Sequence, residues 1–177
     1  MPIRKHKRYN KPRKLFDIAL IKSENALIKK YGLKSRREVW KADFVIGKIR
    51  NIAKTLITAG DKEKQEFVNR QAAKGFNVSS IADVLALSKE DYLKRRLQSV
   101  VVTKKIASTH KQARQMITHR HIKVLGHKID SPAHLTTIEE ETSIDTDLSI
   151  PARKIITDEE KEILSKIKHE KQEKKAD

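Results

Sequence analysis

The feature that most constrains the fold is a run of apolar residues that recur at alternating spacings of three and four. The run comprises Val39, Ala42, Ile46, Ile49, Ala53 and Leu56. These spacings place all the residues on one side of an α-helix, so the segment is expected to form a long helix that buries one face. Ser35 and Glu38 have the spacing of a capping box, which predicts where this helix begins, and Gly60 predicts where it ends.

Other helices are expected on both sides of this one, up to about residue 91. Serine at the first cap position and glycine after the last turn are the usual signs of helix boundaries. The expected spans are 15–31 before Gly32, 61–74 before Gly75, one helix capped by Ser79 or Ser80 that runs through Leu85, and one capped by Ser88 with Asp91 at its third position. The N-terminal half of the chain is therefore predicted to be all-helical.

The hydrophobic period changes within residues 92–129. The apolar face of the next helices is predicted to consist of Leu93, Leu97, Val100, Val101, Ala113, Met116 and Ile117. Thr109 and Gln112 form a second predicted capping box. Apolar and polar residues then alternate over 121–124, and 125–127 has the composition of a tight turn, which predicts a β-hairpin. The expected fold class is α+β: an all-helical N-terminal domain followed by a helix-turn-helix and a β-hairpin.

The charge of the chain points to a polyanionic partner. The sequence holds 40 Lys and Arg against 23 Asp and Glu, a net charge of +17. Residues 1–14 and 92–129 contain no acidic side chain at all. Soluble surfaces normally mix both signs, so two acid-free zones favour nucleic acid as the partner. Arg37, Lys41 and Lys48 lie roughly together on one side of the long helix and are expected to face phosphates. Trp40 either packs at the core edge or stacks on RNA.

Several classes of protein are excluded or disfavoured by composition. The chain has no cysteine, which excludes disulfides, iron–sulfur clusters and cysteine-ligated zinc. Its longest apolar runs have four residues, so neither a membrane span nor a signal peptide is expected. A cytosolic location follows as the expectation.

Five of the seven histidines fall between residues 110 and 134, which raises the question of a metal or catalytic site. His119 and His121 are two residues apart at a helix-to-strand junction, where side chains should diverge, and acidic ligands are missing nearby. Catalysis would need an acid–base pair or a nucleophile in a pocket, and no paired carboxylates accompany these histidines. The remaining interpretations are structural histidines and histidines that contact RNA, of which RNA contact fits the neighbouring cations better.

The segments RRLQ, ASTHKQAR and HRHIKV, followed by a small turn and a proline-containing stretch, resemble the S-four RNA-binding domain. The earlier KKYGLKSRREVWKADFVIGKIRNIAKTLI resembles the helical domain of the S-four family of small-subunit ribosomal proteins, in its archaeal and eukaryotic form. The resemblance covers roughly residues 25–136. Arg120 stands where bacterial members usually have glycine, and the absence of cysteine means that the N-terminal metal site of some bacterial members does not carry over.

The resemblance implies a structural protein that binds a folded junction in the 5′ part of small-subunit rRNA and helps to nucleate assembly. It also implies contact with proteins of the S-five family and with mRNA near the channel through which mRNA reaches the subunit. Neither an enzyme, a small-molecule substrate, a cofactor nor a metal is expected. The expected RNA-binding residues are Arg36, Arg37, Lys41, Lys48, Arg96, Lys104, Lys105, Ser108, Thr109, Lys111, Gln112, Arg114, Gln115, Thr118, His119, Arg120 and His121.

The expected organisation has four parts. Residues 1–14 form a basic arm, 15–91 a helical rRNA-binding domain, 92–136 the S-four-type domain, and 137–177 an acidic extension. Within the extension, 139–150 is expected to be disordered, and the segment that follows a third capping box at Thr157 is expected to form either a short amphipathic helix or a solvated tail. Two alternatives remain: an RNA-modifying enzyme that carries the same domain, such as a pseudouridine synthase, and a non-ribosomal factor of pre-rRNA processing and subunit assembly.

Overall fold

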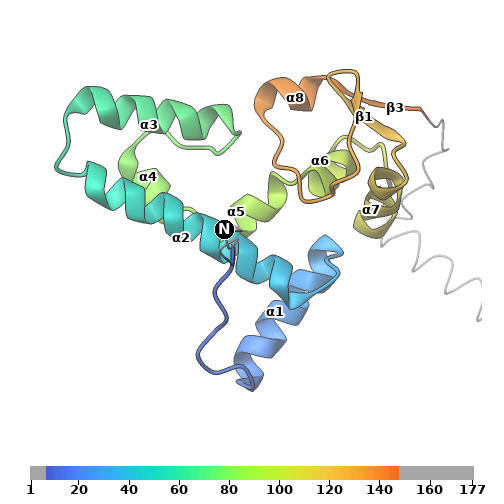
Figure 1. Ribbon diagram of the computed structural model, residues 1–177, viewed down its shortest axis with the longest axis horizontal. Helices are drawn as coiled ribbons and strands as arrows, with labels where there is room; N and C mark the ends of the chain where they lie inside the picture. The colour runs from blue at the N-terminus through green and yellow to red at the C-terminus, as the bar shows by residue number, and fades with distance from the viewer. Residues whose placement is uncertain (1–6, 148–177) are drawn as a thin grey trace, which may run out of the picture.

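The computed structural model describes residues 7–147 and consists of a helical part and a mixed part (Figure 1). The helical part contains α1 (Ile18–Tyr31), α2 (Arg36–Leu56), α3 (Asp61–Ala73), α4 (Ile81–Ala86) and α5 (Lys89–Lys94). All five helices were expected from the sequence, and Gly32 and Gly75 take the left-handed conformation after α1 and α3 (φ 57° and 79°). Of the two serines expected to cap α4, Ser80 is the N-cap residue, and it forms a capping box with Asp83, as Ser88 does with Asp91 at the start of α5.

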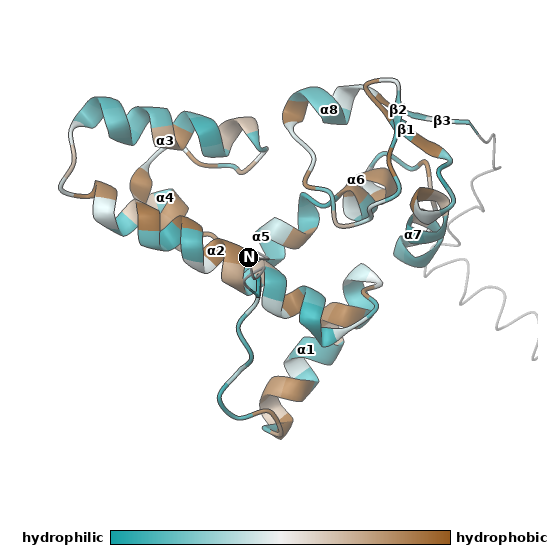
Figure 2. Cartoon of the chain, viewed as in Figure 1, coloured by the Kyte–Doolittle hydropathy of each residue, from teal (hydrophilic) through white to brown (hydrophobic). Residues whose placement is uncertain are grey.

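The stripe on α2 organises the helical part. Its N-terminal members, Val39 and Ala42, pack with α1 and α5, whereas Ile46, Ile49 and Ala53 pack with α3 and α4. Figure 2 shows the resulting alternation of hydrophobic and hydrophilic residues along α2. One long amphipathic helix thus serves two small cores. Within residues 7–147, no helix is both long enough and apolar enough to cross a membrane.

The mixed part contains α6 (Leu97–Thr103), α7 (His110–Thr118), β1 (Ile122–Val124), β2 (His127–Lys128), α8 (Ile138–Thr142) and β3 (Ile144–Thr146). The predicted hairpin is confirmed: β1 pairs antiparallel with β2, and Leu125 and Gly126 both have positive φ (50° and 78°), as a two-residue hairpin turn requires. The α+β class is confirmed as well. Leu97, Val101, Ile117 and Ile122 form the centre of the core beneath the sheet.

The prediction of disorder over 139–150 is wrong for residues 139–147. Thr137 and Glu140 cap α8, and β3 pairs with β1 to give a sheet of order β2-β1-β3. The strand is stabilised because the Ile144 side chain is buried in the core and Asp147 forms ion pairs with Lys123 and Lys128. The sheet therefore extends past residue 136. The helix predicted after Thr157 lies outside the described residues.

The described part of the basic arm, residues 7–14, contains neither helix nor strand but lies against α2. The ring of Tyr9 stacks on the indole of Trp40 at 6.2 Å between centroids, and the Trp40 Nε1–H donates to Glu24 (2.7 Å). Trp40 is therefore a residue of the core edge, as one of the two interpretations held. Its ring already has a stacking partner in the arm.

Candidate nucleic-acid interface

Helix α7 begins in a way that differs in one contact from the predicted capping box. The Thr109 hydroxyl accepts from the backbone N–H of Gln112 (3.2 Å), as predicted. The Gln112 amide oxygen, however, reaches past Thr109 and accepts from the N–H and hydroxyl of Ser108 (3.1 and 2.6 Å). Gln112 thereby orders the turn before α7, and the Ser108 hydroxyl donates within the protein rather than to solvent.

The two sides of α7 are arranged as the sequence predicted, with one exception. Ala113, Met116 and Ile117 are buried, and the exposed residues include Lys111, Gln115 and Thr118. The exception is Arg114, which was expected on the exposed side with them. Its side chain is only 24% exposed, because its guanidinium binds Glu38 of α2.

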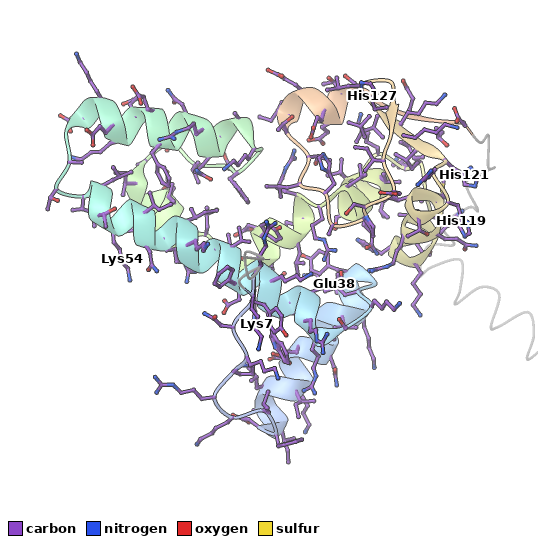
Figure 3. The ribbon with its side chains drawn as sticks, in the orientation of Figure 1. Lys7, Glu38, Lys54, His119, His121 and His127 are labelled. Carbon is purple, nitrogen blue, oxygen red and sulfur yellow. The ribbon has the colours of Figure 1, made fainter. Side chains whose placement is uncertain are left out.

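Glu38 joins the helical part to the mixed part through two arginines (Figure 3). Its carboxylate accepts from Arg96 at 2.7 Å and from the two terminal nitrogens of Arg114 at 3.0 and 3.3 Å. Arg96 was expected on the surface but is 4% exposed. Burial favours a raised pKa for Glu38, but the hydrogen bonds and charges of Arg114 and Arg96 outweigh it and lower the pKa. Glu38 is therefore ionised at neutral pH.

This use of Glu38 explains why the capping box predicted at Ser35 is not formed. Ser35 is the N-cap residue of α2, but its side chain makes no capping hydrogen bond. Glu38 instead accepts from the N–H of Lys34 (3.2 Å), and its other contacts go to the two arginines. A bidentate, partly buried pair with guanidinium groups is stronger than a hydrogen bond to one exposed backbone amide. The Glu38 side chain therefore forms the contact with Arg96 and Arg114 instead of the capping hydrogen bond.

Gln98 and Gly32 complete what we call the interdomain seam, made of Gly32, Glu38, Arg96, Gln98 and Arg114. The two N–H groups of the buried Gln98 amide are shared among the carbonyl oxygens of Tyr31, Gly32 and His110, at 3.1, 3.1 and 2.8 Å from its nitrogen. Two of these carbonyls lie at the C-terminus of α1, where no helical partner is available. Gly32 also lies so close to His110 that a Cβ on it would come within 2.8 Å of the His110 Cβ.

The five clustered histidines have different surroundings. The rings of His119 and His121 stack 6.2 Å apart, so the expectation that these side chains diverge is wrong (Figure 3). His110 is half-buried, burial lowers its pKa, and its ring meets Tyr31 edge-on. His134 pairs with Glu140, and His127 is exposed in the hairpin. Within residues 7–147, no three His, Asp or Glu side chains are placed to share a metal ion.

The predicted RNA-binding cations divide into paired and unpaired groups. Arg96 and Arg114 bind Glu38, Arg36 lies 3.9 Å from Glu24, and Arg120 lies 3.4 Å from Asp130. Among the described residues, no acidic partner lies within ion-pair distance of Arg37, Lys41, Lys48, Lys104, Lys105 or Lys111. The unpaired cations are the better candidates for phosphate contacts, because they lose no protein partner on binding.

The structure brings some of these residues together and leaves others apart along α2. Lys41 shares a cavity of about 220 Å³ with Arg96 and Arg114, at the seam between α2 and α7. Lys48 lies farther along α2, where its ammonium sits over the Phe44 ring (4.9 Å). The sequence analysis missed Glu38 and Gln98 as residues that position this surface. Gln98 lies inside the RRLQ motif, but the motif alone does not show which carbonyls its amide meets.

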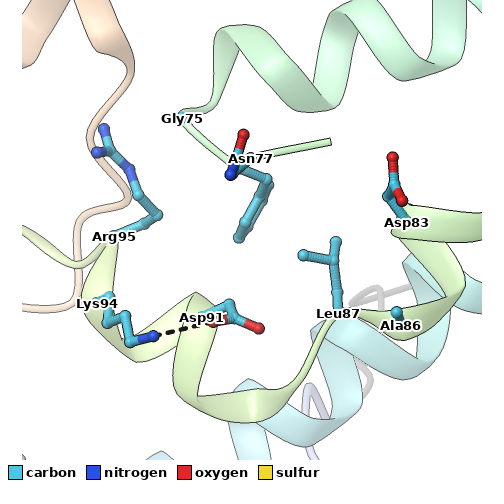
Figure 4. Close-up of a pocket in the computed structure, with 9 residues that line it drawn as sticks. Gly75, Asn77, Asp83, Ala86, Leu87, Asp91, Lys94 and Arg95 are labelled. Carbon is cyan, nitrogen blue, oxygen red and sulfur yellow. Dashed lines mark hydrogen bonds and ion pairs between the residues drawn. The ribbon is translucent and has the colours of Figure 1, made fainter. Parts of the chain in front are cut away.

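A second hollow, of about 490 Å³, opens between the end of α3 and α5 (Figure 4). Asp83 and Asp91 line it, but each accepts hydrogen bonds from the serines that cap its own helix. These bonds lower the pKa of Asp83 to about 2. Burial acts to raise the pKa of Asp91, but its bonds with Ser88 and Lys94 lower it. Both groups are ionised at neutral pH, so neither can act there as a general acid.

Because Lys111 has no acidic partner among the described residues and Arg114 has one, their replacement by alanine is expected to have different effects on stability and on RNA binding. Lys111→Ala should change the free energy of unfolding by no more than about 0.5 kcal/mol, because Lys111 is exposed and unpaired among the described residues. It should weaken RNA binding by about 0.5–1.5 kcal/mol. Arg114→Ala should cost about 1–3 kcal/mol of stability, because it removes a partly buried partner of Glu38. Thermal melting and filter binding of both variants measure these effects; equal melting temperatures would contradict the division.

The comparisons with known proteins agree with this architecture. Residues 95–141 match the family model described as the S4 domain. The chain is 39% identical over 149 residues to small ribosomal subunit protein uS4 of Korarchaeum cryptofilum, covering 81% of this chain and 90% of the relative. It is 37% identical over 161 residues to uS4 of Methanothermobacter thermautotrophicus, covering 88% and 94%. It is 36% identical over 129 residues to uS4 of Saccharolobus solfataricus, covering 69% and 71%.

Proposed function

Because the chain belongs to the uS4 family of small ribosomal subunit proteins, we propose that it is a structural protein of the small ribosomal subunit that binds small-subunit rRNA. The observation that carries the proposal is the likeness to uS4 proteins over 81–88% of the chain, with identities of 37–39%. The unpaired Lys104, Lys105 and Lys111, which lie on and just before α7, support it physically. Location in the ribosome, and hence in the cytoplasm, follows from the same proposal.

The proposed chemistry is binding without catalysis. Lys and Arg side chains neutralise backbone phosphates and release condensed counterions. The unpaired residues Lys104, Lys105 and Lys111 of the mixed part, with Arg37 and Lys41 of α2, are the proposed main phosphate contacts. Gln115, Thr118 and the stacked His119 and His121 add hydrogen-bond donors and stacking surfaces for ribose or unpaired bases. Arg120 is proposed to exchange its exposed partner Asp130 for a phosphate.

Recognition is proposed to depend on RNA shape, because an A-form duplex hides the base edges of its major groove. The proposed target is a folded junction in the 5′ part of small-subunit rRNA, and the protein is proposed to bind it early in assembly. Proteins of the S-five family and mRNA near its channel are the proposed further neighbours. The domain limits at residues 14 and 91 remain our proposal, and the proposed end of the mixed part moves from residue 136 to Thr146 so that it includes β3.

The two alternatives predict different features. A pseudouridine synthase would need a catalytic domain with an essential aspartate, and the carboxylates at the hollow beside α5 are used in helix caps. A non-ribosomal assembly factor would share the RNA-binding surface but leave the particle at maturation. We favour the ribosomal protein, because the relatives that cover most of this chain carry that name.

The proposal is tested by the salt dependence of binding to the 5′ part of small-subunit rRNA. With on the order of 8–10 phosphate contacts, the logarithm of the binding constant should fall with the logarithm of salt concentration at a slope of roughly −6 to −9. Filter binding at several salt concentrations gives this slope, with an unrelated RNA of equal length as the control. A slope shallower than about −2 would contradict a phosphate-dominated interface.

A further inference from the structure

We propose that Glu38 is a positioning residue for RNA binding: it holds the helical and mixed parts in one relative orientation, so that cations on both meet the RNA together. This inference rests on the proposed function. Glu38 itself carries a negative charge into the cationic surface and would not be chosen as an RNA-binding residue from its charge. Its effect on RNA is therefore expected to pass through Arg96, Arg114 and the orientation that they fix.

The contacts across the seam are mostly polar and directional. The core of the mixed part is built from α6, α7, β1 and β3, whereas the two cores of the helical part are built around α2. Leu135 of the mixed part packs on the α2–α4 core. Other contacts across the seam include the Glu38 pairs, the Gln98 hydrogen bonds, the edge-on contact of the Tyr31 and His110 rings and the close approach of Gly32 to His110. Directional hydrogen bonds to several fixed partners specify one orientation more closely than apolar contacts do.

The orientation matters because unpaired cations lie on both sides of the seam. Lys41 belongs to α2 and is exposed at the seam cavity, and Lys111 is exposed on the first turn of α7. When two binding surfaces are rigidly joined, the second contact forms at a high effective concentration. When the joint is loose, RNA binding must also order the two parts, and that cost weakens the affinity.

Simple electrostatics predicts the opposite effect of Glu38. Its charge neutralises part of a cluster that contains Lys41, Arg96 and Arg114. If the cluster acted only through its charge, removing the carboxylate would release two arginines for phosphates and strengthen RNA binding. The direction of the change therefore distinguishes a positioning role from a merely repulsive one.

The test is the affinity of Glu38→Gln for the 5′ part of small-subunit rRNA, at a temperature where circular dichroism shows the variant folded. We expect binding at least about tenfold weaker than that of the wild type, from the lost rigidity of the joint. Val84→Ala is the matched control, because Val84 is fully buried in the α2–α4 core, away from Glu38. It should lower the melting temperature but change affinity less than about twofold.

Equal or tighter binding by folded Glu38→Gln would overturn the positioning role, as would an equal loss of affinity in Val84→Ala. If Glu38→Gln melts below the assay temperature, Glu38→Asp replaces it. The aspartate side chain is one methylene shorter, so its carboxylate cannot reach both arginines with the same geometry. Weaker RNA binding is again expected, and unchanged or tighter binding again overturns the proposal. If the wild type itself fails to bind this RNA, it is the proposed function that fails.

Discussion

Replacing Gly32 with alanine is expected to lower the free energy of unfolding by about 3–5 kcal/mol, from two separate causes. Gly32 has a φ of 57°, a conformation that L-residues adopt only with strain. The added Cβ would also lie 2.8 Å from the His110 Cβ and 3.2 Å from backbone atoms of His110 and Lys111. Backbone atoms at the start of α7 cannot move aside without disturbing the seam.

Two other glycines separate these causes. Gly126 has a φ of 78° but no atom within 4 Å of its added Cβ, so Gly126→Ala should cost only the strain, about 1–2 kcal/mol. Gly47 lies inside α2 with neither strain nor neighbours, so Gly47→Ala should stabilise the protein by about 0.5–1 kcal/mol. Urea unfolding of the three variants measures the series. If Gly32→Ala lowered the free energy of unfolding by no more than Gly126→Ala does, the claim that Gly32 is closely packed against His110 would be wrong.

Replacing Gln98 with leucine is expected to cost about 2–4 kcal/mol, although leucine has a similar volume and the site is buried. The substitution removes the donor that serves the carbonyl oxygens of Tyr31 and Gly32 at the end of α1, and that of His110 on α7. A buried acceptor that loses its partner keeps the cost of desolvation, which the better burial of leucine does not offset.

Gln115→Leu is the control for this substitution, since Gln115 is exposed on α7 and should change stability by no more than about 0.5 kcal/mol. Hydrogen exchange gives a second measurement, because Gln98→Leu should raise the exchange of amides in α1 and α7 before those of α3. A neutral or stabilising Gln98→Leu would show that water or other groups already satisfy the α1 carbonyls, and that the seam does not depend on this amide.

Local structure was predictable from the sequence because its causes are local. The stripe of α2 needs only helical spacing, and the ends of α1 and α3 need only a glycine at the right place. The caps at Ser80 and Ser88 formed as expected because the other partners of Asp83 and Asp91, Ser79 and Lys94, are also local and leave the capping bonds in place. The buried side of α7 followed from the same periodicity, and the order of helices and hairpin followed from the change of the hydrophobic period.

The seam was not predictable in this way, because the two Glu38 pairs at its centre join residues 58 and 76 positions apart. The spacing of Ser35 and Glu38 satisfies the capping rule, but two arginines from α6 and α7 offer the carboxylate a stronger partner. For the same reason Arg96 and Arg114 were expected to be free for RNA. β3 was missed because its short polar sequence carries little strand signal, and only Ile144 and the pairing with β1 show its place.

The most direct test of the central claim is to express the protein with an affinity tag, separate a cell extract on a density gradient, and determine with which particles the tagged protein sediments. A structural protein of the small subunit should be present at about one copy per mature small subunit and should remain there in actively translating particles. Recovery only with precursor particles would favour the assembly factor, and recovery only near the top of the gradient would contradict the ribosomal assignment altogether.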